Sequence, residues 1–270
     1  MKKSIVISTQ PTKFSALAFK ENFEKSIRKV ANLGFDGVEL AVRDPKNLEV
    51  EKIINLLKEC NLEVPAIGTG QAYGEEGLSL SDPDEMVRKM AVERINDQII
   101  FASYFKAQVI IGLIRGKIEE SFDREKAEEW TIDCLRKCTK FAKEYNVRLT
   151  LEPVNRYESN FINTLSEGTE FIKRVGVNNL GLLIDTFHMN IEEVSIEDSL
   201  IQAKDYLTHV HFADSNRWAP GYGHLDFKKV IETLKKIDYQ GYISAEILPL
   251  PDPDTAARIT ADTLNKLNIN

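Results

Sequence analysis

The chain has 270 residues, of which 43% are hydrophobic and 29% are charged, and its formal net charge is -7. A chain of this length buries a substantial core and fits one large compact domain, or at most two small ones. The acidic balance argues against a nucleic-acid partner, because phosphate binding requires a basic surface.

The first residues, MKKSIVISTQ, contain only a short apolar run. This run is too short for the apolar part of a signal peptide or for a membrane span, so we interpret it as a strand and expect a cytoplasmic protein without a membrane partner. The three cysteines, Cys60, Cys134 and Cys138, lack a zinc-type spacing, and we expect them to be packed as free thiols in a reducing compartment.

Short β-branched runs alternate with longer amphipathic segments along the chain, which is typical of βα units around a parallel sheet. Eight runs have the character of strands: Ser4 to Ser8, Gly37 to Leu40, Val64 to Gly68, Gln108 to Gly112, Arg148 to Glu152, Gly181 to Asp185, Leu207 to Phe212 and Tyr242 to Glu246. Four of the helical stretches between and after them are Asn22 to Leu33, Asp84 to Phe105, Arg124 to Tyr145 and Phe227 to Ile237.

Eight βα units in about 250 residues match the usual size of a (β/α)8 barrel. We therefore predict a single TIM-barrel catalytic domain over residues 1–270. A doubly wound sheet remains the alternative, because it shares the βα alternation and differs only in the number and order of its strands.

Glycines mark the turns of this pattern. Gly34 suits a left-handed cap between the first helix and the second strand, and the segment 237–241 plays the same part before the eighth strand. A dinucleotide-binding GxGxxG loop is not present at Gly68 and Gly70, because Tyr73 stands where the motif requires glycine.

Four consecutive predicted strands end in residues of metal-ligand type: Glu152, Asp185, His211 and Glu246. Because side chains alternate along a strand, these four point into the barrel while their apolar neighbours face the helices. Three carboxylates at one barrel mouth would raise one another's pKa unless a cation lay between them. The pattern predicts a divalent-ion site, and its oxygen-rich ligand set favours manganese, magnesium or cobalt over zinc, with Mn²⁺ first.

The strings LEPVNRYES, LLIDTFHMNIEE, VHFADSNRWAPGYGHLDF and AEILP closely resemble the D-tagatose 3-epimerase and D-psicose 3-epimerase family of xylose-isomerase-like barrels. The resemblance extends over nearly the whole chain. It implies the same four metal ligands, and it implies three residues that contact the substrate near its ketone: Glu158, His188 and Arg217. It also implies a homo-oligomer, either a dimer or a tetramer.

We therefore expect an isomerase that inverts the hydroxyl-bearing carbon next to the ketone of a free keto sugar through an enediolate. Metal coordination would stabilise the enediolate, with His188 and Arg217 donating hydrogen bonds to it. Inversion needs a base on one face and an acid on the other, and Glu152 and Glu246, on opposite sides of the ligand arc, suit these catalytic tasks.

Other functions remain open at this point. An aldose-ketose isomerase or an inosose-type dehydratase can begin from the same enediolate on the same metal site. Barrel endonucleases use a histidine-rich cluster of metals and a basic surface, and four histidines with a net charge of -7 argue against them. A non-catalytic sugar-binding protein is the last alternative.

The substrate is less well defined, because the loops from Thr69 to Ser79 and from Leu113 to Ile118 carry no motif for a given sugar. A phosphorylated sugar is not expected, since no glycine-rich cradle follows the seventh or eighth strand. The candidates are a ketohexose and a keto-sugar acid such as 5-ketogluconate or tagaturonate. Lys13, Arg43 and Arg115 are cations that would meet a carboxylate, and Arg115 is preferred because a guanidinium binds a carboxylate through two parallel hydrogen bonds.

Three further polar residues lie near these elements. His209 points inward one layer below His211, which favours a buried, hydrogen-bonded role over ligation. Glu39 ends the second strand across the barrel from the cluster, and we expect rim solvation or substrate contact there. His224 lies in a glycine-rich loop and receives no role.

Overall fold

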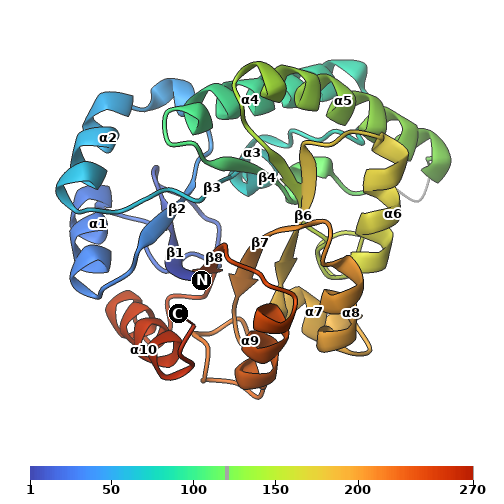
Figure 1. Cartoon of the computed structure of the whole chain (residues 1–270). Helices are drawn as coiled ribbons and strands as arrows, with labels where there is room; N and C mark the ends of the chain where they lie inside the picture. The colour runs from blue at the N-terminus through green and yellow to red at the C-terminus, as the bar shows by residue number, and fades with distance from the viewer. Residues whose placement is uncertain (119–121, 270) are drawn as a thin grey trace.

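The computed structural model describes residues 1–118 and 122–269. Eight parallel strands close into a barrel in the order of the chain, and the helices that follow them surround it (Figure 1). The strands are β1 (Lys2–Ser8), β2 (Gly37–Ala41), β3 (Ala66–Gly68), β4 (Gln108–Ile111), β5 (Leu149–Leu151), β6 (Leu180–Asp185), β7 (Leu207–Phe212) and β8 (Tyr242–Ala245). Pairing of β1 with β8 closes the sheet, which confirms the predicted (β/α)8 barrel and excludes the open, doubly wound alternative.

The helices are α1 (Phe23–Asn32), α2 (Val50–Glu59), α3 (Gly70–Glu76), α4 (Glu85–Ser103), α5 (Arg124–Glu144), α6 (Leu165–Val175), α7 (Thr186–Glu192), α8 (Ile196–Ala203), α9 (Phe227–Lys236) and α10 (Pro253–Lys266), with 3₁₀ turns η1 (Pro45–Asn47) and η2 (Leu113–Arg115). Two of the predicted helical stretches begin at the residue that caps the observed helix. The Asn22 side chain accepts from Lys25 N at the start of α1, and the Asp84 side chain accepts from Met86 N at the start of α4. Among the described residues, none of these helices is long and apolar enough to cross a membrane.

The turns before β2 and β8 differ in which residue adopts the left-handed conformation. Gly34 does so after α1, with φ 76°, as predicted. In the corresponding turn after α9, Asp238 adopts it, with φ 57°, while Gly241 leads into β8. Aspartate tolerates this conformation better than most residues with a Cβ, so the two turns reach the same geometry with different residues.

Side-chain alternation divides the strand residues into two layers. Leu149 and Leu151 of β5 lie in the large apolar core between the sheet and the helices. Ala66, Ile110 and Leu183 form a separate small cluster of buried residues, as expected for the opposite side of the strands, inside the barrel. The predicted inward and outward directions are therefore confirmed, and polar residues above this cluster face the mouth of the barrel.

A bulge between β6 and β7 sets the height of the residues at that mouth. Leu182 pairs with Leu207, but Leu183 pairs with His209, so β7 contains one extra residue at this point. Continuing the first pairing would place Val210 opposite Asp185. The extra residue instead brings His211 level with Asp185.

Candidate functional site

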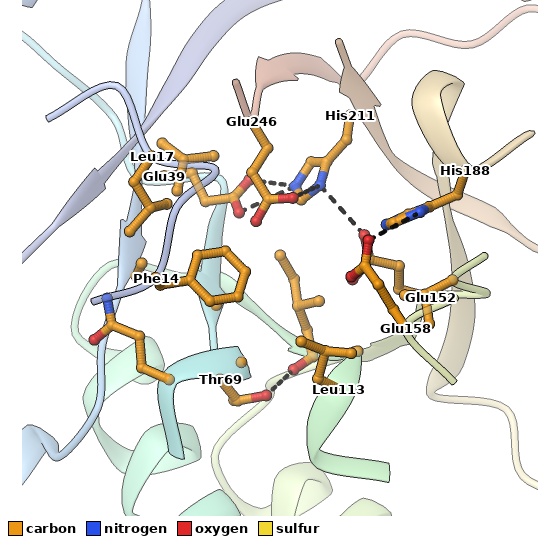
Figure 2. Close-up of a pocket in the computed structure, with 18 of the residues that line it drawn as sticks. Phe14, Leu17, Glu39, Thr69, Leu113, Glu152, Glu158, His188, His211 and Glu246 are labelled. Carbon is orange, nitrogen blue, oxygen red and sulfur yellow. Dashed lines mark hydrogen bonds and ion pairs between the residues drawn. The ribbon is translucent and has the colours of Figure 1, made fainter. Parts of the chain in front are cut away.

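A cavity opens at the carboxyl ends of the strands, where barrels of this type place their active sites. Its two sides differ in character (Figure 2). Glu246, His211 and Glu152 are grouped in one part of the lining, and the apolar side chains of Phe14 and Leu17, with Glu39 beside Leu17, lie in another. The cavity therefore offers charged groups to one end of a ligand and an apolar wall to the other.

The structure brings together the four residues predicted as metal ligands. Glu152 directly follows β5, Asp185 ends β6, His211 lies in β7 and Glu246 directly follows β8. Each offers one ligand atom, and these atoms all lie within 4.8 Å of one another. His211 Nδ1 is 3.5 Å from a Glu152 oxygen and 3.7 Å from oxygens of both Asp185 and Glu246.

The crowding of these charges shifts their protonation equilibria. Burial raises the pKa of Glu246 to about 8, although Arg217 and His211 act in the opposite direction, and the nearby carboxylates add to the increase. Burial alone would also raise the pKa of Asp185, but Arg217 and His188 lower it well below its usual range. The cluster needs positive charge to ionise fully.

The hydrogen bonding of two atoms in the cluster indicates whether the cluster fits a metal ion. Glu152 Oε1 and His211 Nδ1 are buried and have no hydrogen-bond partner among the described residues. Buried polar atoms without partners are costly, and both atoms face the centre of the cluster. Three carboxylates and one imidazole are ligands typical of a divalent ion, so the residues present fit such an ion.

Local structure explains how Asp185 and Arg217 meet. Asp185 caps α7 with one carboxylate oxygen, which accepts from Phe187 N at 2.8 Å, and leaves the other oxygen for the cluster. The Arg217 guanidinium donates to this second oxygen and to Glu246. Although burial opposes it, Asp185 and Glu246 raise the pKa of Arg217 above its usual value. Arg217 thus neutralises part of the carboxylate charge.

The loop after β7 places Arg217 over the cluster. The buried Asp214 carboxylate accepts three main-chain N–H groups of this loop, from Ser215, Gly221 and Leu225. Arg217 itself has φ 65°, a conformation that costs free energy in a residue with a Cβ. Its carbonyl accepts from Leu248 N at 2.8 Å, which ties the loop after β7 to the loop after β8.

Glu39 was expected at the solvated rim or on the substrate, and the expectation of rim solvation is wrong. Its side chain is 1% exposed, and its carboxylate bonds to His209 Nε2 at 2.8 Å and to His211 Nε2 at 3.0 Å. An eight-stranded barrel is narrow enough for a glutamate on β2 to reach β7 across the interior. The predicted buried, hydrogen-bonded role of His209 is confirmed.

This arrangement determines which His211 nitrogen faces the cluster. Burial alone would raise the pKa of Glu39, but His211 and His209 lower it well below its usual range, so Glu39 is a carboxylate and can only accept. Both histidines therefore donate from Nε2. Nδ1 of His211 is left facing Glu152, Asp185 and Glu246.

Replacing Glu39 by Gln is expected to weaken binding of a divalent ion to the cluster about 10- to 100-fold, because a neutral amide orients His211 less firmly and makes its imidazole less basic. Calorimetric titration of the metal-free protein with Mn²⁺ measures the effect. The exposed Glu59→Gln on α2 is the matched control and should bind as the unaltered chain does. Equal affinity of Glu39→Gln and the unaltered chain would contradict this role of Glu39.

The structure places two of the residues implied as substrate contacts beside the cluster. His188, on α7, and Glu158, in the loop after β5, both line the cavity. His188 is 3% exposed, and burial lowers its pKa, which favours the neutral imidazole. The Glu158 side chain is 38% exposed, so it lies nearer the mouth.

Arg115 does not reach the cavity, in contrast to its predicted role with a substrate carboxylate. It is fully buried, and its guanidinium donates to four main-chain oxygens: those of Gly112, Glu152, Phe161 and Ile162. Burial lowers its pKa to about 10, so it stays charged at neutral pH. Its N–H groups are bonded to carbonyls of two loops, and in this way Arg115 joins the end of β4 to the loop after β5.

The other two cations proposed for a substrate carboxylate are also not among the described residues that line the cavity. Arg43 is paired with Glu75 and Glu76, and Lys13 is exposed. Arg217 is the one Lys or Arg among the described residues that line the cavity, and two carboxylates already contact it.

Several residues that line or support the cavity were not predicted from the sequence. Phe14 and Leu17 come from the irregular segment between β1 and α1, where no periodicity predicts a direction. Gln71 lies on α3, and Asn155 lies behind His188. The sequence pointed to Asn155 only through its position between Glu152 and Glu158 in LEPVNRYES, and this position does not indicate what the side chain contacts.

Comparisons with known proteins agree with this fold. The family model described as "Xylose isomerase-like TIM barrel" matches residues 27–267. D-psicose 3-epimerase of Ruminiclostridium cellulolyticum is 34% identical over 84% of this chain and 79% of its own length. The 3-dehydro-D-guloside 4-epimerase of Escherichia coli is 30% identical over 84% of this chain and 88% of its own length.

A solved structure extends the similarity to three dimensions. The crystal structure of D-psicose 3-epimerase with D-tagatose from Clostridium cellulolyticum superposes with a TM-score of 0.84 at 26% identity, covering 99% of this chain and 98% of that one. The similarity in sequence and in fold therefore covers most of the chain. The chain belongs to the xylose isomerase-like TIM-barrel family and, within it, to the carbohydrate epimerases that include the D-psicose 3-epimerases.

Proposed function

We propose that this chain is a divalent-metal-dependent epimerase that inverts the hydroxyl-bearing carbon next to the ketone of a free keto sugar, with the barrel as its single catalytic domain. The observation that carries the proposal is the cluster of Glu152, Asp185, His211 and Glu246 at the cavity, in which a Glu152 oxygen and His211 Nδ1 have no hydrogen-bond partner within the described part of the chain. Relatives named as ketose 3-epimerases and as a 4-epimerase of a dehydro-sugar support the reaction class.

These four residues would bind the ion, and Mn²⁺ is the first candidate because carboxylate oxygens dominate the set and one imidazole completes it. A bound divalent ion would act as a Lewis acid on the ketone oxygen and the neighbouring hydroxyl of the sugar. Mg²⁺ and Co²⁺ satisfy the same ligands.

Glu152 and Glu246 are the proposed proton carriers. They follow β5 and β8, which have β6 and β7 between them in the barrel, so they extend toward the cluster from different strands. A sugar between them would present one face of the reacting carbon to each carboxyl group. Removal of the proton by one and return by the other, on the opposite face, inverts the carbon.

His188, Arg217 and Glu158 are the proposed contacts near the ketone. When the proton leaves, negative charge develops on the ketone oxygen, and donors aimed at that oxygen stabilise the transition state. His188 and Arg217 offer N–H donors beside the cluster. Glu158 can accept from a terminal hydroxyl at the mouth.

The charge of the cavity favours an unphosphorylated substrate. Arg217 already contacts two carboxylates, and the described lining contains no further Lys or Arg to balance a phosphate. A ketohexose meets no such cost. A keto-sugar acid such as 5-ketogluconate or tagaturonate remains in the proposed class, and uncharged or main-chain groups would have to bind its carboxylate.

A substrate panel with the Mn²⁺-loaded protein tests the proposal. Fructose, psicose, tagatose, 5-ketogluconate and tagaturonate are the free keto sugars, and fructose 6-phosphate is the matched phosphorylated control. We expect inversion next to the ketone for at least one free keto sugar, with kcat/KM for fructose 6-phosphate about 100-fold or more below it, because an unpaired phosphate charge costs several kcal/mol to desolvate.

The products also separate the alternatives. An aldose product would indicate an aldose-ketose isomerase, and loss of water would indicate a dehydratase on the same cluster. Failure to turn over any sugar in the metal-loaded state would contradict the proposed epimerase and favour a binding protein.

A further inference from the structure

We infer that Asn155, a residue in the loop after β5, is a positioning residue that keeps the proton of His188 on Nε2 and orients Glu158 at the mouth of the cavity. The inference rests on the proposed epimerase function for its consequence in catalysis. The contacts that carry it are independent of that function.

Asn155 is 1% exposed and contacts His188 through two donors. Its main-chain N–H lies 3.3 Å from His188 Nδ1, and its side-chain Nδ2 lies 2.7 Å from the same atom. A main-chain N–H can only donate, so Nδ1 must accept. In a neutral imidazole with an accepting Nδ1, the proton is on Nε2.

The orientation of the Asn155 amide follows from a third contact. Its Oδ1 accepts from the main-chain N–H of Tyr157 at 3.0 Å, which identifies the other end of the amide as the donor. The two protons of Nδ2 then have separate acceptors. One is His188 Nδ1, and the other is Glu158 Oε1 at 2.9 Å.

One side chain therefore controls two of the proposed substrate contacts. The His188 ring extends toward the cavity, and Nε2 has no hydrogen bond to any other described residue (Figure 2). With the proton on Nε2, His188 is a neutral donor toward the ketone oxygen, where charge develops. The other tautomer would present a lone pair to the same oxygen and repel it. His188 is thus a hydrogen-bond donor in this site rather than a base.

Two substitutions separate positioning from packing. Asn155→Leu removes both Nδ2 protons at similar size, and Asn155→Asp puts an acceptor in place of the donor. In both, kcat should fall about 10- to 100-fold with little change in KM, as is typical when the partner that orients a functional side chain is lost. Asn160→Asp is the control, because Asn160 lies in the same loop, and its side chain bonds to the main chain of Ile118 and to no other described residue.

The tautomer of His188 can also be measured directly by NMR, without an assay of turnover. The chain has four histidines, so ¹⁵N-histidine labelling of the Mg²⁺-loaded protein gives four ring systems to assign by NMR. In the unaltered chain, His188 should show an unprotonated Nδ1 and a protonated Nε2. In Asn155→Asp, Nδ1 should become protonated, while Asn160→Asp should leave the spectrum of His188 unchanged.

The outcomes distinguish failure of the positioning role of Asn155 from failure of the proposed epimerase function. A protonated Nδ1 in the unaltered chain, or kcat and tautomer both unchanged in Asn155→Asp, would overturn the positioning role. A loss of Mn²⁺ affinity equal to the loss of kcat would also overturn it, because it would indicate general disruption of the site. The expected tautomers in a protein without epimerase activity would instead refute the proposed function alone.

Discussion

Removal of divalent ions is expected to abolish epimerisation, and addition of Mn²⁺ is expected to restore it. The physical reason is the cluster of Glu152, Asp185 and Glu246 around His211 Nδ1, in which two buried ligand atoms have no hydrogen-bond partner among the residues that the structure describes. The ion would act as a Lewis acid on the ketone, and without it general acid–base catalysis alone would contribute only about 10²- to 10⁴-fold. Activity should therefore fall below detection.

The measurement is turnover before and after exhaustive chelation, followed by titration with Mn²⁺, Mg²⁺ and Co²⁺. The thermal midpoint gives a second readout, because an ion present at 100 times its Kd stabilises the folded state by about 2.7 kcal/mol. Asp185→Asn should remove most of both effects. Full activity in the demetallated protein would refute metal dependence.

Substitution of either proposed proton carrier should reduce kcat by about 10²- to 10⁴-fold, the usual contribution of a positioned acid or base. Glu152→Gln and Glu246→Gln both keep an amide oxygen that can still bind the ion, so some metal affinity should remain. Loss of turnover with retained metal would show that the carboxyl groups act on protons as well as on the ion.

Hydrogen exchange with deuterated solvent distinguishes the two faces. If each carboxyl group serves one face, each variant should still exchange the substrate hydrogen of one epimer while failing to invert it. The epimer that exchanges should differ between Glu152→Gln and Glu246→Gln. The exposed Glu59→Gln should exchange and invert both epimers normally. Normal inversion by both active-site variants would contradict the assignment.

Local patterns in the sequence determined the barrel and the composition of its cluster. The predicted strands and helices agree with the observed ones because period-two and helical alternation depend on neighbours along the chain. The convergence of Glu152, Asp185, His211 and Glu246 also followed from the sequence. Carboxyl ends of consecutive parallel strands share one edge, so residue type and parity were sufficient.

The positions of residues that act across the barrel or within loops were decided only by the tertiary structure. Glu39 reaches His209 and His211 through the barrel interior, a contact over 170 residues that no local pattern encodes. Arg115 was assigned to a ligand because of its charge, but the path of two loops surrounds its guanidinium with carbonyls. The contact between Asn155 and His188 likewise depends on the path of the loop after β5. Side-chain direction on a strand follows from chirality and period, whereas in a loop it follows from main-chain dihedrals that only packing and hydrogen bonding fix.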